Sequence, residues 1–579
     1  MATPRCSHSA RVANMMQIIP ANARLHSGVA DGKKREPMWK QIWKIGAVDN
    51  EGPACPGQVV ELDDGTKVLI VVDGSKPGKA ISVVGSTCPH VGAPLVNGVL
   101  HENHLLCPWH GACFNVQTGD IEEGPSIHSI PVYKHRIREG HVEIEIDPET
   151  KAPVVLPRKT PAVSSEQINK VVVIGGGAGG HAAVSILVEQ GFKGSITLIS
   201  EENSLPYDRP TLSKNMSKPL DSILLSPPSF YSGKVKLILG TTATAIRAAE
   251  KTVVLQNGTF EPYDKLIVAT GGSPFKLRIP GSDLRHIYTL RSAADANAIA
   301  TRADAAKKIV IVGAGFIGLE AASYFKRNCD AESITILNRD PAPPLANVFG
   351  KDIGSCVQAL HESNGIKFVF NCGISQFLPG LDPKEVGKVV TDKGEFEADL
   401  VLIGIGVSLN TSLLKGVVEL TENIGEVQVN HFMQTTNCDI YAVGDIARFP
   451  LWSSTGKTRS EHWAVAQNQG RTAARHILGL LQPFKSVPFF WSVLFGAGIR
   501  FAGYTSKYDR VIIDGDLGQR KFLAFFIVGD SVAAVASLGR DPMVAAAIEL
   551  FRSNRMPTTK ELESDHGSRD LRKRLAQLS

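Results

Sequence analysis

Two short segments combine cysteine and histidine in a pattern suited to binding metal. Cys88 and His90 belong to the first segment, and Cys107 and His110 to the second. A two-iron, two-sulfur cluster of the Rieske type needs this set, because two thiolates hold one iron and two imidazoles hold the other. Zinc is the alternative, since two cysteines and two histidines also bind zinc. We favour the cluster, because both pairs are closely spaced among glycines and prolines with no finger helix.

A glycine-rich turn follows the apolar run at 171–174 and precedes a segment with helical spacing. Gly175, Gly177 and Gly180 fit the pattern G-x-G-x-x-G, in which glycines allow a tight turn, close approach of a pyrophosphate and tight helix packing. Glu201 follows the next apolar run, where a carboxylate can bind a ribose. The sequence therefore predicts a dinucleotide-binding β-α-β unit.

The same pattern returns after the apolar run at 309–312. Its glycines are Gly313, Gly315 and Gly318, and Glu320 follows on the first helical turn. Where the ribose acid is expected, this unit has Arg339, which can accommodate a 2′-phosphate. NADPH is thus an option beside NADH; the alternative is that Arg339 merely faces solvent. Two such units suggest one tightly bound flavin dinucleotide and one exchangeable nicotinamide dinucleotide.

These patterns predict a multidomain chain with an N-terminal all-β domain, two interleaved Rossmann-like α/β domains and a C-terminal α+β domain. The expected boundaries are 38–148 for the all-β domain, 149–168 for a linker, 169–300 with 396–482 for the FAD-binding domain, 301–395 for the NAD(P)-binding domain, and 483–556 for the C-terminal domain. The charged segment 557–579 is expected to be flexible.

Composition excludes several classes of protein. The net charge is only +5 over 579 residues with no dense basic tract, so we expect no nucleic-acid partner. The longest apolar stretch, 487–499, is too short to span a membrane. Nine cysteines without a Cys-x-x-Cys pair favour a reducing compartment over a disulfide scaffold.

The first thirty residues contain no Asp or Glu but several arginines and serines. This composition is typical of an organelle transit peptide, and the alternative is a disordered tail. We therefore assign 1–37 to one or the other, and expect a mitochondrial location with the cytoplasm as the alternative.

The residues from Cys107 to Asn115 resemble the ferredoxin-type Rieske family. The segments 206–214, 266–272 and 439–445 resemble motifs of FAD-containing pyridine nucleotide oxidoreductases of the ferredoxin reductase branch. From about residue 39 to 555 the chain is similar to the apoptosis-inducing-factor-like family that carries an N-terminal Rieske domain. It departs from that family at Asn338, where an acid is common, and after Ser492, where bacterial ferredoxin reductases have Asp-Gln.

The resemblance implies roles for five residues. Lys214 and Glu320 form the expected catalytic pair: Lys214 stabilises the reduced flavin near its N5, and Glu320 approaches the nicotinamide. The other three bind FAD: Arg209 holds it, Asp445 binds the ribityl chain, and Trp463 lies beside the isoalloxazine. Arg339 remains the candidate for the coenzyme phosphate from its position alone.

The resulting hypothesis is an NAD(P)H oxidoreductase in which FAD accepts hydride and an intramolecular Rieske cluster carries electrons to an unknown acceptor. A Rieske oxygenase is disfavoured, because it would need a downstream triad of two histidines and a carboxylate. A rival of another class is a redox-sensing interaction protein of cell death with incidental turnover. The oligomeric state, for which a homodimer is one option, is not readable from the sequence.

Overall fold

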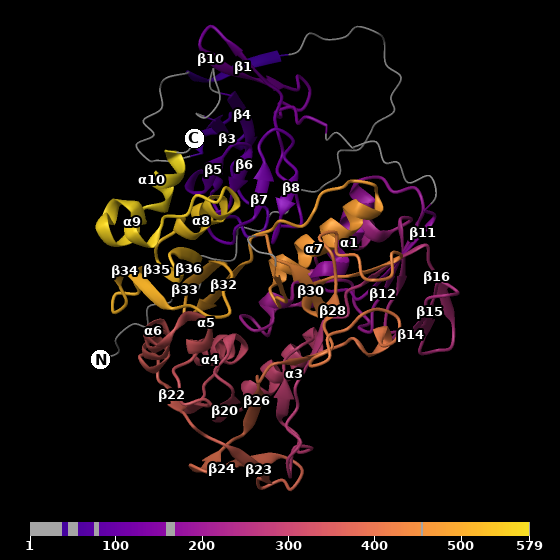
Figure 1. Cartoon of the computed structure of the whole chain (residues 1–579), viewed down its shortest axis with the longest axis vertical. Helices are drawn as coiled ribbons and strands as arrows, with labels where there is room; N and C mark the ends of the chain where they lie inside the picture. Colours follow the sequence, from indigo (N-terminus) through magenta and orange to yellow (C-terminus); the bar gives the residue numbers. More distant parts are fainter. Residues whose placement is uncertain (1–37, 45–55, 74–79, 158–167, 453–455, 578–579) are drawn as a thin grey trace, which may run out of the picture.

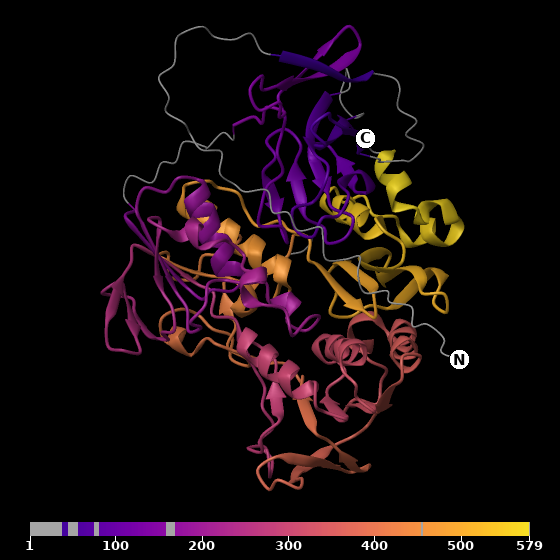
Figure 2. The same cartoon turned by 180° about the vertical axis from the view of Figure 1, so that it is seen from behind.

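The computed structural model describes residues 38–44, 56–73, 80–157, 168–452 and 456–577, and these form four packed domains (Figure 1). The N-terminal domain lies at one end of the molecule and the second nucleotide-binding domain at the other, as both views show (Figure 2). The first nucleotide-binding domain and the C-terminal domain lie between them. The predicted fold class is confirmed, whereas the predicted tail or transit peptide lies outside the described residues.

The N-terminal domain consists of three small antiparallel sheets, with strand orders β1-β10-β9, β2-β3-β4 and β5-β6-β7-β8. Its apolar runs rich in β-branched residues, such as 68–71 in β3, are buried in two apolar clusters. The strands are β1 (Met38–Lys44), β2 (Gly57–Glu61), β3 (Lys67–Asp73), β4 (Ala80–Gly85), β5 (Val99–His101), β6 (His104–Leu106), β7 (Cys113–Asn115), β8 (Ile121–Glu123), β9 (His135–Arg138) and β10 (His141–Ile146).

The first nucleotide-binding domain has a parallel sheet of order β13-β12-β11-β17-β29. Helix α7 packs along α1, and a Cβ at Gly470 would lie 2.0 Å from the carbonyl oxygen of Gly179, so this close approach needs glycine. The elements are β11 (Lys170–Ile174), α1 (Ala178–Glu189), β12 (Ser195–Ile199), α2 (Pro228–Tyr231), β13 (Val235–Ile238), β14 (Ala243–Arg247), β15 (Thr252–Leu255), β16 (Phe260–Pro262), β17 (Lys265–Val268), β28 (Val427–Gln428), β29 (Ile440–Ala442), β30 (Ala447–Pro450), β31 (Lys457–Thr458) and α7 (Trp463–Ile477).

The second nucleotide-binding domain has a parallel sheet of order β19-β26-β20-β21-β22. The chain enters and leaves it through an antiparallel pair, β18 (Gly272–Pro274) with β27 (Val407–Leu409). The elements are β19 (Ile287–Thr289), α3 (Ala293–Ala303), β20 (Lys308–Val312), α4 (Phe316–Asn328), β21 (Ser333–Leu337), α5 (Ala346–Phe349), α6 (Lys351–Glu362), β22 (Ile366–Val369), β23 (Ile374–Pro379), β24 (Val386–Thr391), β25 (Gly394–Glu397) and β26 (Leu400–Ile403).

Two boundaries expected from the sequence are therefore wrong. The segment 287–300 and strand β26 were expected in the FAD-binding domain, but β19 and β26 hydrogen-bond within the second sheet, and α3 packs in its core. Part of the expected linker also belongs to the N-terminal domain, because the Val154 amide donates to the Glu145 carbonyl at 2.9 Å.

The C-terminal domain has an antiparallel sheet of order β32-β33-β36-β35-β34 covered by helices. The described part of the expected flexible tail, residues 557–577, is instead largely helical, and Leu562, Leu571 and Leu575 are fully buried in one apolar core with residues of α8 and the sheet. Its elements are β32 (Phe489–Leu494), β33 (Ala497–Gly503), β34 (Arg510–Asp516), β35 (Lys521–Val528), β36 (Ser531–Leu538), α8 (Met543–Arg552), α9 (Thr559–Ser564) and α10 (Leu571–Ala576). In the described part of the chain, no helix has the length and apolarity needed to cross a membrane.

The N-terminal domain docks on helix α7 of the first nucleotide-binding domain. The Gly124 amide donates to Asn468 Oδ1 at 2.7 Å, and Arg471 Nη2 donates to the Ser126 carbonyl at 2.7 Å. A Cβ at Gly124 would lie 2.4 Å from Gln467 Oε1, so the helix lies directly against this loop. Buried contacts of this kind fix the relative position of two domains.

Candidate active site

The two segments predicted to bind metal form loops of the same geometry. In the first loop the Cys88 amide donates to the Ala93 carbonyl at 2.8 Å, and the Gly92 amide donates to the Cys88 carbonyl at 2.9 Å. The loop at 107–112 repeats both bonds at 2.8 and 3.2 Å. Each loop bends at a glycine of positive φ, +79° at Gly92 and +70° at Gly111, which other residues rarely adopt.

The four candidate ligands lie together at the tips of these loops. Cys88 and Cys107 are buried and hydrogen-bond to each other. This bond, together with burial, raises the pKa of Cys88. The same bond lowers the pKa of Cys107. His90 Nδ1 lies 3.1 Å from His110 Nδ1, with the rings nearly perpendicular. A cysteine pair and a histidine pair are therefore each in contact.

The donor atoms fit a two-iron cluster better than a single zinc ion. A tetrahedral zinc site, with bonds of about 2.0–2.3 Å, draws all its donor atoms within roughly 4 Å of one another. Among the described residues, the only group of three or more metal-binding side chains whose donor atoms all lie within 4.8 Å is a different one, His104 with Cys113 and Glu122. The separation of the candidate ligands into two pairs matches a cluster in which each pair holds its own iron.

The surroundings of both imidazoles favour their neutral form. Burial lowers the pKa of His110 to about 2, helped by the charges of Arg500 and Lys214. Burial also lowers the pKa of His90, against the opposing charge of Asp208. A neutral imidazole offers the lone pair that a metal requires. Asp208 and Lys214 belong to the predicted flavin segment, so this segment contributes to the electrostatic environment of the histidine pair.

Trp491 of strand β32 contacts the histidine pair from the C-terminal domain. Its ring centroid lies 4.5 Å from that of His110 and 5.9 Å from that of His90. The neighbouring residue Phe489 packs against the second loop, where a Cβ at Gly111 would lie 3.2 Å from its ring. No sequence pattern predicted the contact between Trp491 and His110, because the two residues are far apart in the chain.

Lys214 and Glu320, predicted as the catalytic pair, lie in direct contact. Lys214 Nζ is 2.9 Å from Glu320 Oε2 and donates to the Pro210 carbonyl at 3.1 Å. Glu320 is only 5% exposed. Two hydroxyls that the sequence did not single out complete its surroundings: Ser492 Oγ donates to Oε1 at 2.7 Å, and Ser213 Oγ donates to Oε2.

The remaining flavin candidates form a second polar group. Arg209 pairs with Glu202 and donates to the Tyr207 hydroxyl at 3.0 Å and to the Arg291 carbonyl at 2.9 Å. Arg291 Nη2 lies 3.7 Å from Asp445 Oδ2. Burial raises the pKa of Asp445 against the opposing charge of Arg291.

The other candidates lie apart from these groups. Glu201 is exposed just beyond β12, and Arg339 is exposed just beyond β21. Trp463 is half-buried at the start of α7, next to His462, whose buried Nδ1 has no hydrogen-bond partner among the described residues.

The glycine loops have room for the phosphates of a dinucleotide. A Cβ at Gly175 would lie 2.2 Å from the Ala269 carbonyl oxygen, and one at Gly180 would lie 1.9 Å from the Gly175 carbonyl oxygen, so backbone packing requires both glycines. Gly177, in contrast, faces open space at the N-terminus of α1, where a phosphate is favoured. The second loop repeats this arrangement with Gly313, Gly318 and the open Gly315.

Comparisons with known proteins agree with this architecture. The family model "Pyridine nucleotide-disulphide oxidoreductase" matches residues 169–470, "Rieske [2Fe-2S] domain" matches 44–134, and "Reductase C-terminal" matches 489–575. The chain is 33% identical to Apoptosis-inducing factor 3 of Homo sapiens over 88% of this chain and 84% of that protein. It is 30% identical to putidaredoxin reductase CamA of Pseudomonas putida, over 69% of this chain and 94% of that protein.

A solved structure shares most of the reductase part. The crystal structure of the covalent putidaredoxin reductase-putidaredoxin complex superimposes with a TM-score of 0.66 at 28% identity, covering 71% of this chain and 98% of that chain.

Fold, site and relatives define an NAD(P)H-dependent flavoprotein oxidoreductase that uses FAD and carries a Rieske [2Fe-2S] cluster. The chain belongs to the apoptosis-inducing-factor-like family of pyridine nucleotide-disulphide oxidoreductases, in its ferredoxin reductase branch.

Proposed function

We propose that this enzyme passes electrons from NADH or NADPH through FAD to the Rieske cluster of the same chain, and from there to an external acceptor. Strand β32 carries this proposal. Its Ser492 hydroxyl donates to Glu320 at 2.7 Å, and Glu320 pairs with Lys214. The adjacent ring of Trp491 lies 4.5 Å from that of His110, so two consecutive residues link the catalytic pair with a candidate cluster ligand.

We assign the cluster to Cys88, Cys107, His90 and His110. The cluster supplies a one-electron carrier when bound. The buried thiols and neutral imidazoles offer the donor set it needs. A complete ligand set of this kind favours catalysis over the rival cell-death interaction protein, because a binding scaffold has no need of it.

We assign FAD to the first nucleotide-binding domain and NAD(P)H to the second. FAD supplies the conversion between hydride transfer and single-electron transfer when bound. Gly177 and Gly315 leave room for the two pyrophosphates, and Arg209, Asp445 and Trp463 are the further FAD contacts. Lys214 and Glu320, with the two serine hydroxyls, orient the reacting rings and hold a charge pair beside them.

The coenzyme residues are proposed on the basis of their position in each unit. Glu201 follows β12, where it can accept hydrogen bonds from the FAD ribose. Arg339 follows β21 in the second unit and is exposed, as a side chain that binds a 2′-phosphate must be.

Rapid mixing of the purified holoenzyme with NADH or NADPH under anaerobic conditions tests the electron route. We expect flavin bleaching followed by cluster reduction at a rate independent of protein concentration, as an intramolecular step requires. A second phase proportional to protein concentration would mean that electrons pass between molecules and would overturn the proposal.

We also propose a mitochondrial location, supported by the composition of the first thirty residues, which contain no Asp or Glu. The full chain and a chain that starts at residue 38, each fused to a fluorescent protein, provide the test. Mitochondrial fluorescence of the full chain alone is expected, and cytoplasmic fluorescence of both would overturn the assignment.

A further inference from the structure

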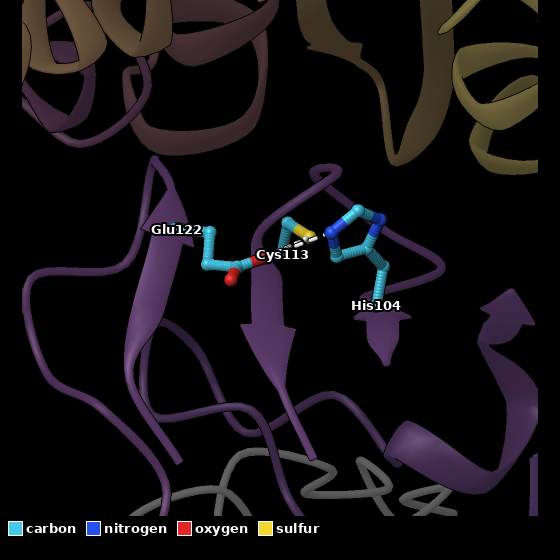
Figure 3. Close-up of side chains that lie close together, drawn as sticks. All are labelled: His104, Cys113 and Glu122. Carbon is cyan, nitrogen blue, oxygen red and sulfur yellow. Dashed lines mark hydrogen bonds and ion pairs between the residues drawn. The ribbon is translucent and has the colours of Figure 1, made fainter. Parts of the chain in front are cut away.

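A partly buried polar network joins the N-terminal domain to helix α8 of the C-terminal domain. His104 is at its centre: its Nε2 lies 3.1 Å from Glu122 Oε2 and its Nδ1 lies 3.4 Å from Glu549 Oε2. Figure 3 shows His104, Cys113 and Glu122 converging from the neighbouring strands β6, β7 and β8. Glu549 reaches them from a helix 445 residues away in the sequence.

Arg552, one turn further along α8, extends the network. Its guanidinium pairs with Glu549 and lies 2.5 Å from Glu123 Oε2. Burial alone would lower the pKa of Arg552, but Glu123 and Glu549 raise it, so the side chain stays charged. The Glu549 side chain is only 2% exposed. We call these five residues, His104, Glu122, Glu123, Glu549 and Arg552, the docking network.

The arrangement of charges favours an ion-pair network over a metal site. The donor atoms of His104, Cys113 and Glu122 lie within 4.8 Å of one another, as they would around a divalent cation. However, Arg552 Nη1 lies 4.0 Å from Cys113 Sγ, and a cation there would face this buried positive charge. Glu122 and Glu549 raise the pKa of His104 to about 10, so its imidazole is a second positive charge among three carboxylates.

The network lies next to the cluster loop. His104 begins β6, which leads directly to Cys107, and Cys113 begins β7, directly after the loop 107–112. Apolar contacts surround the network, since Val99 and Leu106 share one buried core with residues of α8 and of β35. Arg500 Nε adds a bond to the Trp109 carbonyl within the loop, at 2.6 Å.

We propose that His104 and Arg552 are positioning residues that hold the second ligand loop against the C-terminal domain, so that the histidine pair stays in contact with Trp491 during turnover. This inference rests on the proposed function, because it concerns the electron-transfer step into the cluster. Loss of the network would let the loop shift, and electron transfer slows as the distance between the two carriers grows.

The test measures two phases after anaerobic mixing of holoenzyme with NADH: flavin bleaching and cluster reduction. Flavin and iron contents establish first that each variant is folded. Arg552→Met and Glu549→Gln should leave flavin bleaching unchanged and slow cluster reduction about tenfold or more. Arg552→Lys keeps the charge and should restore most of the rate. If the Arg552→Met protein does not accumulate, His104→Gln replaces it.

Asp514→Asn is the control, because Asp514 pairs with Arg540 at 3.0 Å inside the C-terminal domain, and its 23% exposure is close to the 19% of Arg552. It should change neither phase. Cluster reduction at the wild-type rate in Arg552→Met and Glu549→Gln overturns the positioning role, as does tight binding of added Zn²⁺ that is lost in Cys113→Ser. A wild-type protein that shows no second phase would instead contradict the proposed function.

Discussion

Lys214 Nζ lies 2.9 Å from Glu320 Oε2, although the two residues come from different nucleotide-binding domains. The contact brings the flavin segment onto the helix that follows the second glycine loop. It also fixes the interface of the two domains at the point where a nicotinamide and a flavin ring are expected to meet. Ser492, from a third domain, bonds to the same carboxylate at 2.7 Å.

The first prediction concerns this pair. Lys214→Met leaves the buried Glu320 without its counter-charge and should slow flavin reduction by NADH about tenfold, as expected for a charge-assisted hydrogen bond worth roughly 1.5–3 kcal/mol. Rapid-mixing absorbance of the flavin measures the rate. Lys234→Met, at an exposed site, should match the wild type. An unchanged rate in Lys214→Met would remove this residue from the reaction.

The second prediction concerns Trp491. Trp491→Leu removes the ring that contacts His110 and should slow cluster reduction by roughly an order of magnitude, because the gap beside the ligand widens. Flavin reduction should not change. Trp39→Leu, in the N-terminal sheet, controls for the loss of any tryptophan. Equal slowing of both phases in Trp491→Leu would point to a folding defect and would contradict a specific role.

The third prediction concerns coenzyme choice. Arg339→Ala should raise the KM for NADPH about tenfold and leave the KM for NADH unchanged, because only NADPH carries the 2′-phosphate. Steady-state reduction of ferricyanide with each coenzyme measures both constants. Arg327→Ala, at the opposite end of α4 from the glycine loop, is the control. An equal change in KM for both coenzymes would show that Arg339 does not bind the 2′-phosphate.

The fourth prediction concerns pH. The pKa of His104 is raised from 6.5 to about 10, so the protonated imidazole stabilises the fold fully below pH 6.5, and this contribution is lost as the pH rises towards 10. The titratable and charged groups around the His104 imidazole and its carboxylate partners are Glu122, Glu549, Arg552, Cys113, Glu123 and His101.

Accordingly, His104→Gln should lower the thermal unfolding midpoint at pH 6.5, because the free energy of unfolding falls by about 1.5–3 kcal/mol. The difference in stability between the variant and the wild type should shrink by pH 10. Calorimetry at several pH values measures it. A difference between the two proteins that stays constant from pH 6.5 to pH 10 would show that His104 is not charged in the fold.

Local patterns in the sequence predicted the elements that depend on neighbouring residues. The candidate ligands of each loop, for example Cys107 and His110, lie within four residues of each other in the chain, and the glycines of each nucleotide loop lie within six, so each motif can be recognised from its spacing. Glu320 was placed by the same logic, one helical turn after its glycine loop.

Contacts between distant segments could not be predicted in this way. Trp491 contacts His110, and Glu549 contacts His104, only because the C-terminal domain packs on the N-terminal domain. The hydrophobic periodicity of the sequence does not indicate which domains pack together. The C-terminal segment looked flexible because it is charged. Its capping box at Thr558 and Glu561, and the spacing of Leu571 and Leu575, were the local signals for helices that bury a few apolar side chains.

Anaerobic titration of the purified protein with NADH and NADPH, followed by optical and EPR spectra together with metal analysis, tests the electron route most directly. The account predicts about two irons per chain and a reduced Rieske signal that grows once the flavin takes up electrons. Zinc in place of iron, or a cluster that stays oxidised beside a fully reduced flavin, would contradict it.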